Sequence, residues 1–467
     1  MTRLSEGNLP AIAALGVEVP VYERRALLPR ILHVGVGGFH RAHMAVYTDE
    51  TAAAGDTWGI RGAGLLEADT RMAEVLREQD YLYTVVERDS NGSRPRVVGS
   101  IVDHALVAGD ETTFSRLVAD PHLAILSLTI TEGGYSLATR NDTIESVVSA
   151  LEARRRAGSR PLTVLSCDNL PANGDVARRA ITTVAARRSG ELTEWLEAEC
   201  TFPNSMVDRI TPQTKDTDRE WLRDQVGIDD RWPVVCEPFR QWVLEDRFAA
   251  GRPVWEEVGV LFTDRVHDWE LYKLRLLNAS HSCMAYLTAL AGIVYVDEAI
   301  AVPAVRGYLE QFLQAEAIPT LAAIPGHPPD EYAATVLARF ENTGVRDQIA
   351  RLCIDGTAKF PSFVIPTVEA QLAGDGPVVC AALALAGWSR YLATVPDDVR
   401  AADPHGERAA ALAVEALDEP LRFLELDEVF TAPVRASAHF RDAFAEASRR
   451  LASDGPLGAM ENILAPK

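Results

Sequence analysis

The feature that most limits the possible folds is a short apolar run that leads straight into glycines. Residues 30–36 read RILHVGV, and Gly37, Gly38 and an amphipathic stretch follow them. Aliphatic residues bounded by glycine are typical of a buried strand, and a strand that turns through Gly-x-Gly into a helix is a common first unit of a parallel sheet. We therefore expect an α/β domain to begin here.

Further apolar runs alternate with amphipathic stretches through the first half of the chain. This alternation predicts a mainly parallel sheet, because parallel strands need a crossover connection that is usually a helix. Asn91-Gly92 lies within residues 81–101, where apolar and polar residues alternate on either side of it, which predicts an antiparallel hairpin inserted into this domain. The other candidate strands are WGIRGAGL (58–65), LAILSLTI (123–130), PLTVLSCDN (161–169) and WEEVGVLFTD (255–264).

Strand patterns stop at about Asp264, and helical patterns continue nearly to the end. We predict two domains, an α/β domain over residues 1–264 and a predominantly helical domain over residues 265–467. The chain of 467 residues is long enough for both domains to have a core.

Composition narrows the partners and the compartment. A net charge of −21 repels nucleic-acid backbones and anionic membranes, so we expect neither as a partner. The longest apolar runs, residues 283–296 and 378–388, are shorter than the roughly 20 residues of a membrane span. Six cysteines lie far apart, with no signal-peptide pattern, which favours the reducing cytoplasm. Composition does not predict the oligomeric state.

The glycine turn is a candidate dinucleotide site. Gly35 would make the tight turn, and Gly37 would let the backbone approach a pyrophosphate at the following helix N-terminus. His40 stands where a third glycine is usual, which indicates either a looser junction or a side chain with its own role. A purely structural glycine turn is the alternative.

The second candidate strand runs into LEAD, which includes Glu67 and Asp69. An acidic side chain there would accept hydrogen bonds from the adenosine ribose and would repel a 2′-phosphate, so NAD is favoured over NADP. The sequence does not distinguish between the two carboxylates, and a solvated loop charge is the alternative interpretation for each.

The segment DWELYKLRLLNASHSCMAYL (268–287) carries four polar groups on one side of a predicted helix. At about 100° per residue, Glu270, Lys273, Asn278 and His281 fall within an arc of roughly 140°. An exposed face is the alternative, but the apolar continuation favours burial, which is costly for Lys and Glu unless they pair or function.

Lys273 is the candidate general base, because a desolvated lysine loses its charge more readily. His281 lies about 12 Å further along the axis, at 1.5 Å per residue, so it is expected to bind a ligand rather than to abstract a proton. A structural histidine is the alternative for His281.

Two clusters in the first domain follow candidate strands. Asp168, Asn169 and Asn173 follow the strand near residue 165, and ligands bind at the carboxyl ends of parallel strands. Asp208 and Arg209 precede a proline, and from these residues alone an ordinary surface ion pair is the favoured interpretation.

Together these stretches resemble the polyol-specific long-chain dehydrogenases, most closely the mannitol 2-dehydrogenase branch. The resemblance covers nearly the whole chain, and the Lys-x-x-x-x-Asn-x-x-His spacing is specific. The matching segments, in the family's order, are GVGGFHRAH, LTITEGGY, SCDNLPANG, MVDRITP, VVCEPFRQWVLEDRF, KLRLLNASHS and RFENTGVRDQIARLCIDGTAKFP. The resemblance implies a Rossmann-type NAD-binding domain and a helical substrate domain that meet at a metal-independent active site.

The resemblance also implies roles for individual residues. Lys273 becomes the general base, with Glu270 as a proton-relay carboxylate or, alternatively, a stabilising ion-pair partner. The amides that stabilise the alkoxide are Asn169 and Asn278. Substrate hydroxyls would be bound by His281 and Asp208, and the far end of the polyol by Arg351 and Lys359. The cofactor loop would include Phe39, His40, Arg41 and, from a second loop, Glu132.

The expected activity is NAD-dependent oxidation of a sugar alcohol, hexitol or pentitol, to a ketose and the reverse reduction. No His/Cys/Glu cluster with zinc-ligand spacing is visible, so we expect metal independence. One alternative is a ketouronate reductase, such as a fructuronate or tagaturonate reductase, with Arg351 and Lys359 facing the carboxylate of the substrate. A second alternative is a non-catalytic NAD-sensing protein.

Overall fold

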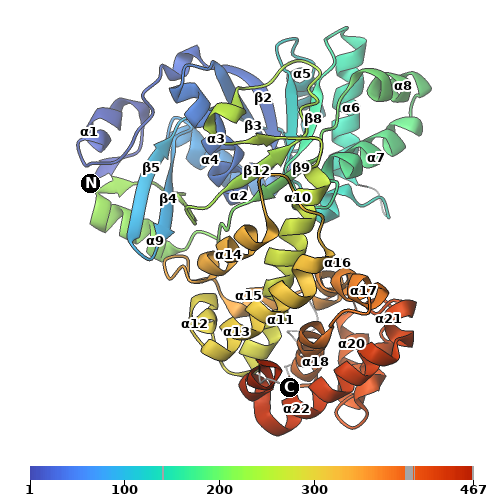
Figure 1. The fold of residues 1–467 in the computed structure, drawn as a ribbon. Coiled ribbons are helices and arrows are strands. Elements are labelled where there is room, and N and C mark those ends of the chain that lie inside the picture. Colours follow the sequence, from blue (N-terminus) through green and yellow to red (C-terminus); the bar gives the residue numbers. More distant parts are fainter. Residues whose placement is uncertain (139–140, 395–402, 404, 465–467) are drawn as a thin grey trace. The chain divides into compact units, whose positions relative to one another are not determined.

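The computed structural model describes residues 1–138, 141–394, 403 and 405–464, and it divides into two compact units, Met1–His267 and Asp268–Lys467. The N-terminal unit contains a five-stranded parallel sheet in the order β6-β3-β2-β7-β8 (Figure 1). The strands are β2 (Leu28–Val34), β3 (Trp58–Gly64), β6 (Ile101–Leu106), β7 (Ile125–Leu128) and β8 (Thr163–Ser166). This sheet confirms the predicted α/β fold.

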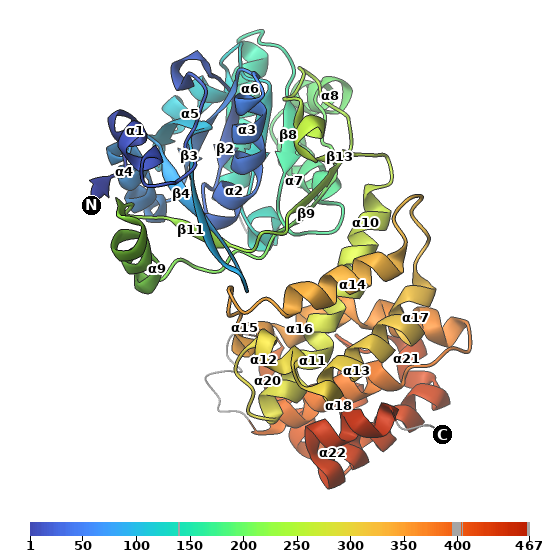
Figure 2. The same cartoon turned by 60° about the vertical axis from the view of Figure 1, so that its left-hand side comes forward.

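Both faces of the sheet are covered by helices (Figure 2). Successive residues of β2 enter different cores: Ile31 lies in the core that includes residues of α3 (Met44–Ala53), and Leu32 in the core beneath α6 (Asp142–Arg156) and α7 (Asn173–Ala186). Burial on both faces explains why the strands read as continuous apolar runs. The remaining helices of this sheet domain are α2 (Gly38–Ala42), α4 (Thr70–Glu78), α5 (Glu111–Val118) and α8 (Gly190–Glu199).

The hairpin predicted around Asn91-Gly92 is confirmed. Strands β4 (Tyr83–Asp89) and β5 (Gly92–Val98) pair antiparallel, with Asp89 opposite Gly92, and β11 (Val234–Cys236) joins the other side of β4. A further small sheet pairs β13 (Leu261–Phe262), β12 (Gln241–Leu244) and β9 (Ser205–Asp208). Near the N-terminus are β1 (Thr2–Arg3), β10 (Ile228–Asp229), α1 (Leu9–Ala13) and α9 (Asp216–Trp221).

Two strand predictions are corrected. The candidate over 255–264 is a 3₁₀ turn, Trp255–Val258, followed by the two-residue β13, because Gly259 has φ +98° and breaks the extended backbone. The fifth strand of the parallel sheet is instead β6, which follows the hairpin directly and pairs with β3.

The C-terminal unit is helical, and its core is built around α11 (Ala279–Leu290) and α18 (Val379–Thr394), which pack together. Aromatic rings connect their neighbours: Tyr286 stacks on Phe360, and Phe360 contacts Trp388, which meets Phe423 edge-on. Other helices are α10 (Val266–Tyr272), α12 (Val296–Ile300), α13 (Pro303–Gln311), α14 (Pro329–Phe340), α15 (Ile349–Leu352), α16 (Gly356–Phe363), α17 (Ile365–Ala373), α20 (Gly406–Glu415), α21 (Ala432–Ala436) and α22 (Ala438–Leu464). In the part of the chain that the structure describes, no helix is long and apolar enough to cross a membrane.

Candidate active site

The glycine loop leaves β2 and enters α2. Gly35 has φ +91°, and a Cβ there would lie 2.1 Å from the Thr129 carbonyl oxygen, so only glycine fits. Gly37 is exposed, and a Cβ there would meet nothing closer than the Gly35 oxygen at 3.8 Å. Open space in front of a helix start, whose first N–H groups have no partner within the helix, fits a pyrophosphate.

The residues that follow the glycines, His40 and Arg41, are buried inside the unit. His40 is buried, with its ring stacked on His33 at 3.4 Å between centroids. Arg41 is also buried, donates from Nε to the Gly37 oxygen at 3.3 Å, and lies over the Tyr83 ring. Burial lowers the pKa of Arg41 to about 10. These side chains brace the loop, and a direct contact of either with a cofactor stays a prediction.

Phe39 also packs inside the unit, where its ring stacks on His43 at 4.9 Å. The imidazole of His43 is joined through Nε2 to the Gln241 carbonyl oxygen at 2.9 Å. Phe39 thereby connects the cofactor loop with the segment that includes β12.

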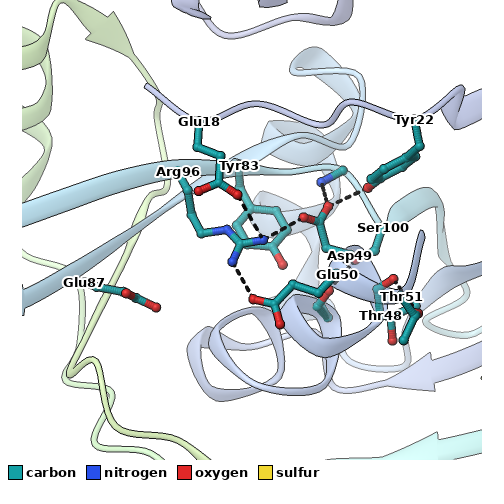
Figure 3. Close-up of polar contacts among 12 residues, drawn as sticks. Glu18, Tyr22, Thr48, Asp49, Glu50, Thr51, Tyr83, Glu87, Arg96 and Ser100 are labelled. Atoms are coloured by element: carbon teal, nitrogen blue, oxygen red, sulfur yellow. Dashed lines mark hydrogen bonds and ion pairs between the residues drawn. The ribbon is translucent and has the colours of Figure 1, made fainter. Parts of the chain in front are cut away.

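Helix α3 continues from α2 and is anchored by a buried charged network (Figure 3). Arg96 of β5 pairs with Asp49 at 2.9 Å and with Glu50 at 2.7 Å, and Arg240 also binds Glu50. The Tyr22 hydroxyl donates to Asp49 at 2.5 Å. Burial raises the pKa of Asp49, and Arg96 opposes this shift. The network ties the helix behind the glycine loop to the hairpin and to the N-terminal segment.

The two carboxylates after β3 have different surroundings. Asp69 accepts a hydrogen bond from the backbone N–H of Leu66 at 3.0 Å, which closes the 3₁₀ turn Glu67–Asp69. Glu67 is exposed. Glu132 lies in the turn Glu132–Tyr135, but its side chain is outside the described part of the structure.

The end of β8 is rigidly held. Asp168 accepts from the N–H of Thr131 at 2.8 Å and from the Tyr135 hydroxyl at 2.7 Å. Asn173, at the start of α7, donates to the carbonyl oxygens of Asp168 and Ser205. Burial raises the pKa of Asp168, while the Tyr135 hydroxyl and the N–H groups of Ile130 and Thr131 oppose this shift. Asn169, the next residue, is exposed at this supported strand end.

The surface ion pair expected at Asp208 and Arg209 is wrong. Both residues are 4% exposed, and the partner of Arg209 is Glu87, at 2.5 Å. Arg209 also donates to the carbonyl oxygens of Ala42 at 2.6 Å and Glu237 at 2.9 Å. Arg209 therefore binds the end of α2 and the hairpin to the end of β9, where Asp208 lies.

The helix with the proposed base is not uniformly α-helical. Residues Lys273–Asn278 form a π-turn between α10 and α11, and the Ala279 N–H bonds to the Leu274 oxygen, five residues back. A π-turn takes one more residue than an α-turn, so it moves the residues beyond it back by about 100°. Glu270, Lys273, Asn278 and His281 then span roughly 80° rather than the predicted 140°.

Burial on this helix is uneven. Glu270 is 5% and Lys273 is 8% exposed, so neither lies on an exposed face. Asn278 and His281 are half-buried, and the His281 ring packs on Phe340 at 4.5 Å. The polar groups are therefore largely withdrawn from water, and π-turns are frequent at functional sites.

Arg351 and Lys359 lie in α15 and α16. Arg351 is exposed, donates from Nε to Asp347 at 2.7 Å and forms an ion pair with this carboxylate. Lys359 donates to the Leu352 oxygen at 3.1 Å, and burial, followed by the charge of Arg351, lowers its pKa. Among the described residues, no three His, Cys, Asp or Glu side chains are grouped so as to hold a metal ion.

Comparison with known proteins decides the family. The chain matches the mannitol dehydrogenase Rossmann domain over residues 29–257 and the mannitol dehydrogenase C-terminal domain over residues 265–452. The chain belongs to the mannitol dehydrogenase family. The family resemblance found in the sequence is thereby confirmed.

Relatives within the mannitol dehydrogenase family align over almost the whole chain. The mannitol 2-dehydrogenase of Aspergillus terreus is 38% identical over 98% of each protein, and that of Cereibacter sphaeroides is 40% identical over 88% of this chain and 91% of its own. A Pseudomonas fluorescens mannitol 2-dehydrogenase, solved as a ternary complex with NAD and D-mannitol, is 38% identical with a TM-score of 0.88 over 99% of both chains. A substrate-free D-sorbitol dehydrogenase is 33% identical, with a TM-score of 0.89 over 98% of this chain and 100% of its own.

Sequence reasoning missed two residues that support the glycine loop of this chain. His33, within β2, contacts Thr129 through Nε2 at 3.0 Å, and Thr129 donates to the Gly35 oxygen at 2.7 Å. A histidine inside an otherwise apolar strand is the signal that would have identified the first of them, since buried polar side chains need partners.

Proposed function

We propose that this chain is an NAD-dependent polyol dehydrogenase that interconverts a sugar alcohol and its ketose. The observation that carries the proposal is membership of the mannitol dehydrogenase family over both domains, with full-length similarity to a mannitol 2-dehydrogenase solved with NAD and D-mannitol. The open space at Gly37 before the start of α2 is compatible with the pyrophosphate.

NAD, when bound, supplies the acceptor for the hydride that leaves the alcohol carbon. Lys273, as a neutral amine, removes the hydroxyl proton. The side-chain amides of Asn169 and Asn278 donate hydrogen bonds to the same oxygen and stabilise the negative charge that develops on it. In the reverse direction Lys273 returns the proton to the carbonyl oxygen.

Four further residues have proposed binding roles. His281 and Asp208 bind substrate hydroxyls, and Arg351 and Lys359 bind the far end of the substrate. Glu270, one turn before Lys273, relays the proton towards solvent. A stabilising role for Glu270 predicts instead that its replacement by Gln lowers stability and leaves the rate of proton transfer unchanged.

The ketouronate alternative requires a cation that is available to a substrate carboxylate. Arg351 is already paired with Asp347, and burial, followed by the charge of Arg351, lowers the pKa of Lys359. Because Arg351 already has an anionic partner, we propose a neutral polyol as the substrate. Mannitol and sorbitol are both candidates, because a mannitol 2-dehydrogenase and a D-sorbitol dehydrogenase are similarly close structural relatives.

The test is an assay of the full chain with mannitol, sorbitol, arabinitol and xylitol, each with NAD and with NADP, followed at the nicotinamide absorbance. Fructose and fructuronate are compared in the reductive direction with NADH. We expect turnover of a polyol with NAD, unchanged after exhaustive chelation. Preference for fructuronate would support the ketouronate alternative, absence of any turnover would support an NAD sensor, and rescue of a chelated enzyme by zinc alone would refute the lysine mechanism.

The site of action is proposed to be the reducing cytoplasm. All six cysteines are buried and none forms a disulfide. Free thiols persist in a reducing compartment, whereas exported proteins commonly use disulfides. Fractionation of the source cells, with a cytoplasmic enzyme as marker, tests this placement.

A further inference from the structure

A fully buried histidine lies directly behind the glycine loop and outside the proposed chemistry. His33 is in β2, and its two ring nitrogens contact Ser127 Oγ at 2.9 Å and Thr129 Oγ1 at 3.0 Å. Nε2 also lies 3.2 Å from the Gly35 carbonyl oxygen. The contacts connect β2 with β7 at the point where both strands end.

The hydrogen bonds determine which tautomer His33 adopts. Thr129 Oγ1 has one proton, which it donates to the Gly35 oxygen at 2.7 Å, so towards His33 it can only accept. Nε2 of His33 therefore carries the hydrogen, and Nδ1 accepts from the Ser127 hydroxyl. Burial lowers the pKa of His33 to about 3, which keeps the ring neutral and the direction of the bonds fixed.

All of these bonds converge on one carbonyl group. The Gly35 oxygen accepts from the N–H of Gly37 at 2.7 Å as well as from Thr129 and His33. Because the peptide group is planar, fixing this oxygen fixes the orientation of the next N–H in the loop. The backbone conformation of Gly35 is thus fixed by the partners of its carbonyl group as well as by the absence of a side chain.

Thr129 is itself held in place. The N–H groups of Ile130 and Thr131, which follow it, both donate to the Asp168 carboxylate, at 3.0 and 2.8 Å. The backbone N–H of Thr129 donates to the Val34 oxygen at 3.0 Å. A residue fixed on both sides can hold the loop without moving.

We propose that His33 and Thr129 are positioning residues for the dinucleotide: the relay from Ser127 through His33 and Thr129 to the Gly35 carbonyl holds the glycine loop in the conformation that receives the pyrophosphate. This inference rests on the proposed function, because it requires that NAD binds at the glycine loop. Neither residue takes part in the chemical step, so the relay acts on NAD affinity and not on the affinity for the polyol.

The test uses the full chain with Thr129→Val, which keeps the shape of the side chain and removes the hydroxyl. Thr129→Ser restores the hydroxyl. Thr51→Val is the control for the loss of a threonine hydroxyl, because Thr51 is buried in the same unit and its hydroxyl donates to the Thr48 carbonyl oxygen of its own helix. NADH affinity is measured by fluorescence titration, polyol KM and kcat at saturating NAD, and stability by thermal melting.

We expect Thr129→Val to weaken NADH binding about three- to tenfold, the usual effect of one hydrogen bond, and to change the polyol KM and kcat less than twofold. Thr129→Ser should recover most of the affinity, and Thr51→Val should bind as the unaltered chain does. Equal NADH affinity in Thr129→Val and the unaltered chain would overturn the relay and leave the proposed function standing. Failure of the unaltered chain to bind NADH would overturn both.

A second measurement needs no substitution. In the ¹⁵N spectrum of the imidazoles, His33 should be neutral with its hydrogen on Nε2. The same signal should persist in Thr51→Val and shift in Thr129→Val. A hydrogen on Nδ1 of His33 in the unaltered chain would refute the direction of the relay.

Discussion

The two glycines Gly35 and Gly37 of the glycine loop should respond in different ways to the same substitution, Gly→Ala. Gly35→Ala places a Cβ 2.1 Å from the Thr129 carbonyl oxygen and forces a side-chain-bearing residue to φ +91°. Gly37→Ala places a Cβ in open space, with the Gly35 oxygen at 3.8 Å as its nearest neighbour. The first change acts on folding, whereas the second acts on the ligand.

Gly16→Ala is the control that distinguishes the backbone strain in Gly35→Ala from the clash with the Thr129 carbonyl group. Gly16 has a similar φ of +82°, and a Cβ there would meet nothing within 4 Å. Gly16→Ala should therefore cost only the backbone strain, about 1–2 kcal/mol. Gly35→Ala adds a clash with backbone that can be relieved only by separating the ends of β2 and β7, for which overpacking suggests about 1–3 kcal/mol more.

The assays are urea unfolding, followed by the fluorescence of tryptophans such as the buried Trp242 and Trp255 of this unit, and NADH titration. We expect Gly35→Ala to unfold at a clearly lower urea concentration than Gly16→Ala. We expect Gly37→Ala to be as stable as the unaltered chain and to bind NADH at least tenfold more weakly. Equal stability of Gly35→Ala and Gly16→Ala would refute the clash, and unchanged NADH affinity in Gly37→Ala would refute the placement of the pyrophosphate.

Three other predictions test the proposed chemistry and the helical unit. Lys273→Ala should retain NADH binding, lower kcat by about 10² to 10⁴ and lose the rise of alcohol oxidation with pH, since only a neutral amine accepts the proton; an unchanged kcat and pH profile would show that this lysine is structural. Glu67→Lys should raise the ratio of kcat/KM with NADP to kcat/KM with NAD more than Asp69→Lys does, because Asp69 already closes a turn with Leu66. A larger rise in Asp69→Lys would identify Asp69 as the residue that contacts the ribose. Burial raises the pKa of Glu316 from 4.5 to about 7, so between these pH values the folded chain binds more protons than the unfolded chain. The stability of the helical unit should therefore fall as the pH rises from about 4.5 to 7. Glu316→Gln should reduce this fall in melting temperature, and an equally steep fall in the variant would exclude Glu316 as its source.

Local patterns predicted most of the parallel sheet and its inserted hairpin. The strands β2, β3, β7 and β8 are buried on both faces and therefore read as apolar runs. Strand β6 was missed because it lies at the edge of the sheet, paired only with β3, and carries Asp103 and His104. An edge strand can expose one side to water, so its sequence need not be apolar.

The missed parts of the site depend on contacts between distant segments. Arg209 reads locally as a turn residue, but its guanidinium bonds to Glu87 and to the backbone at Ala42 and Glu237, far away in the sequence. The relay at His33 is equally non-local, since its partner Thr129 is 96 residues away. Patterns of neighbouring residues contain no information about contacts between distant segments. The family motifs identified the candidate site residues but not the residues that hold them in place.

A uniform α-helix gave the wrong angular positions for the residues around the candidate base, because Lys273–Asn278 form a π-turn. Lys273–Asn278 contains no proline or glycine that would announce a distortion, and its flanking helices α10 and α11 continue on both sides. Hydrogen bonds to the fifth residue back are rare, so the turn is expected to persist only where packing or function favours it. Here the extra residue rotates Asn278 and His281 by about 100° towards the side of Glu270 and Lys273, which narrows four polar positions to one stripe of roughly 80°. The proposed base Lys273 and the proposed amide Asn278 must share a face to act on one oxygen, and the π-turn places both on one face of a largely buried helix.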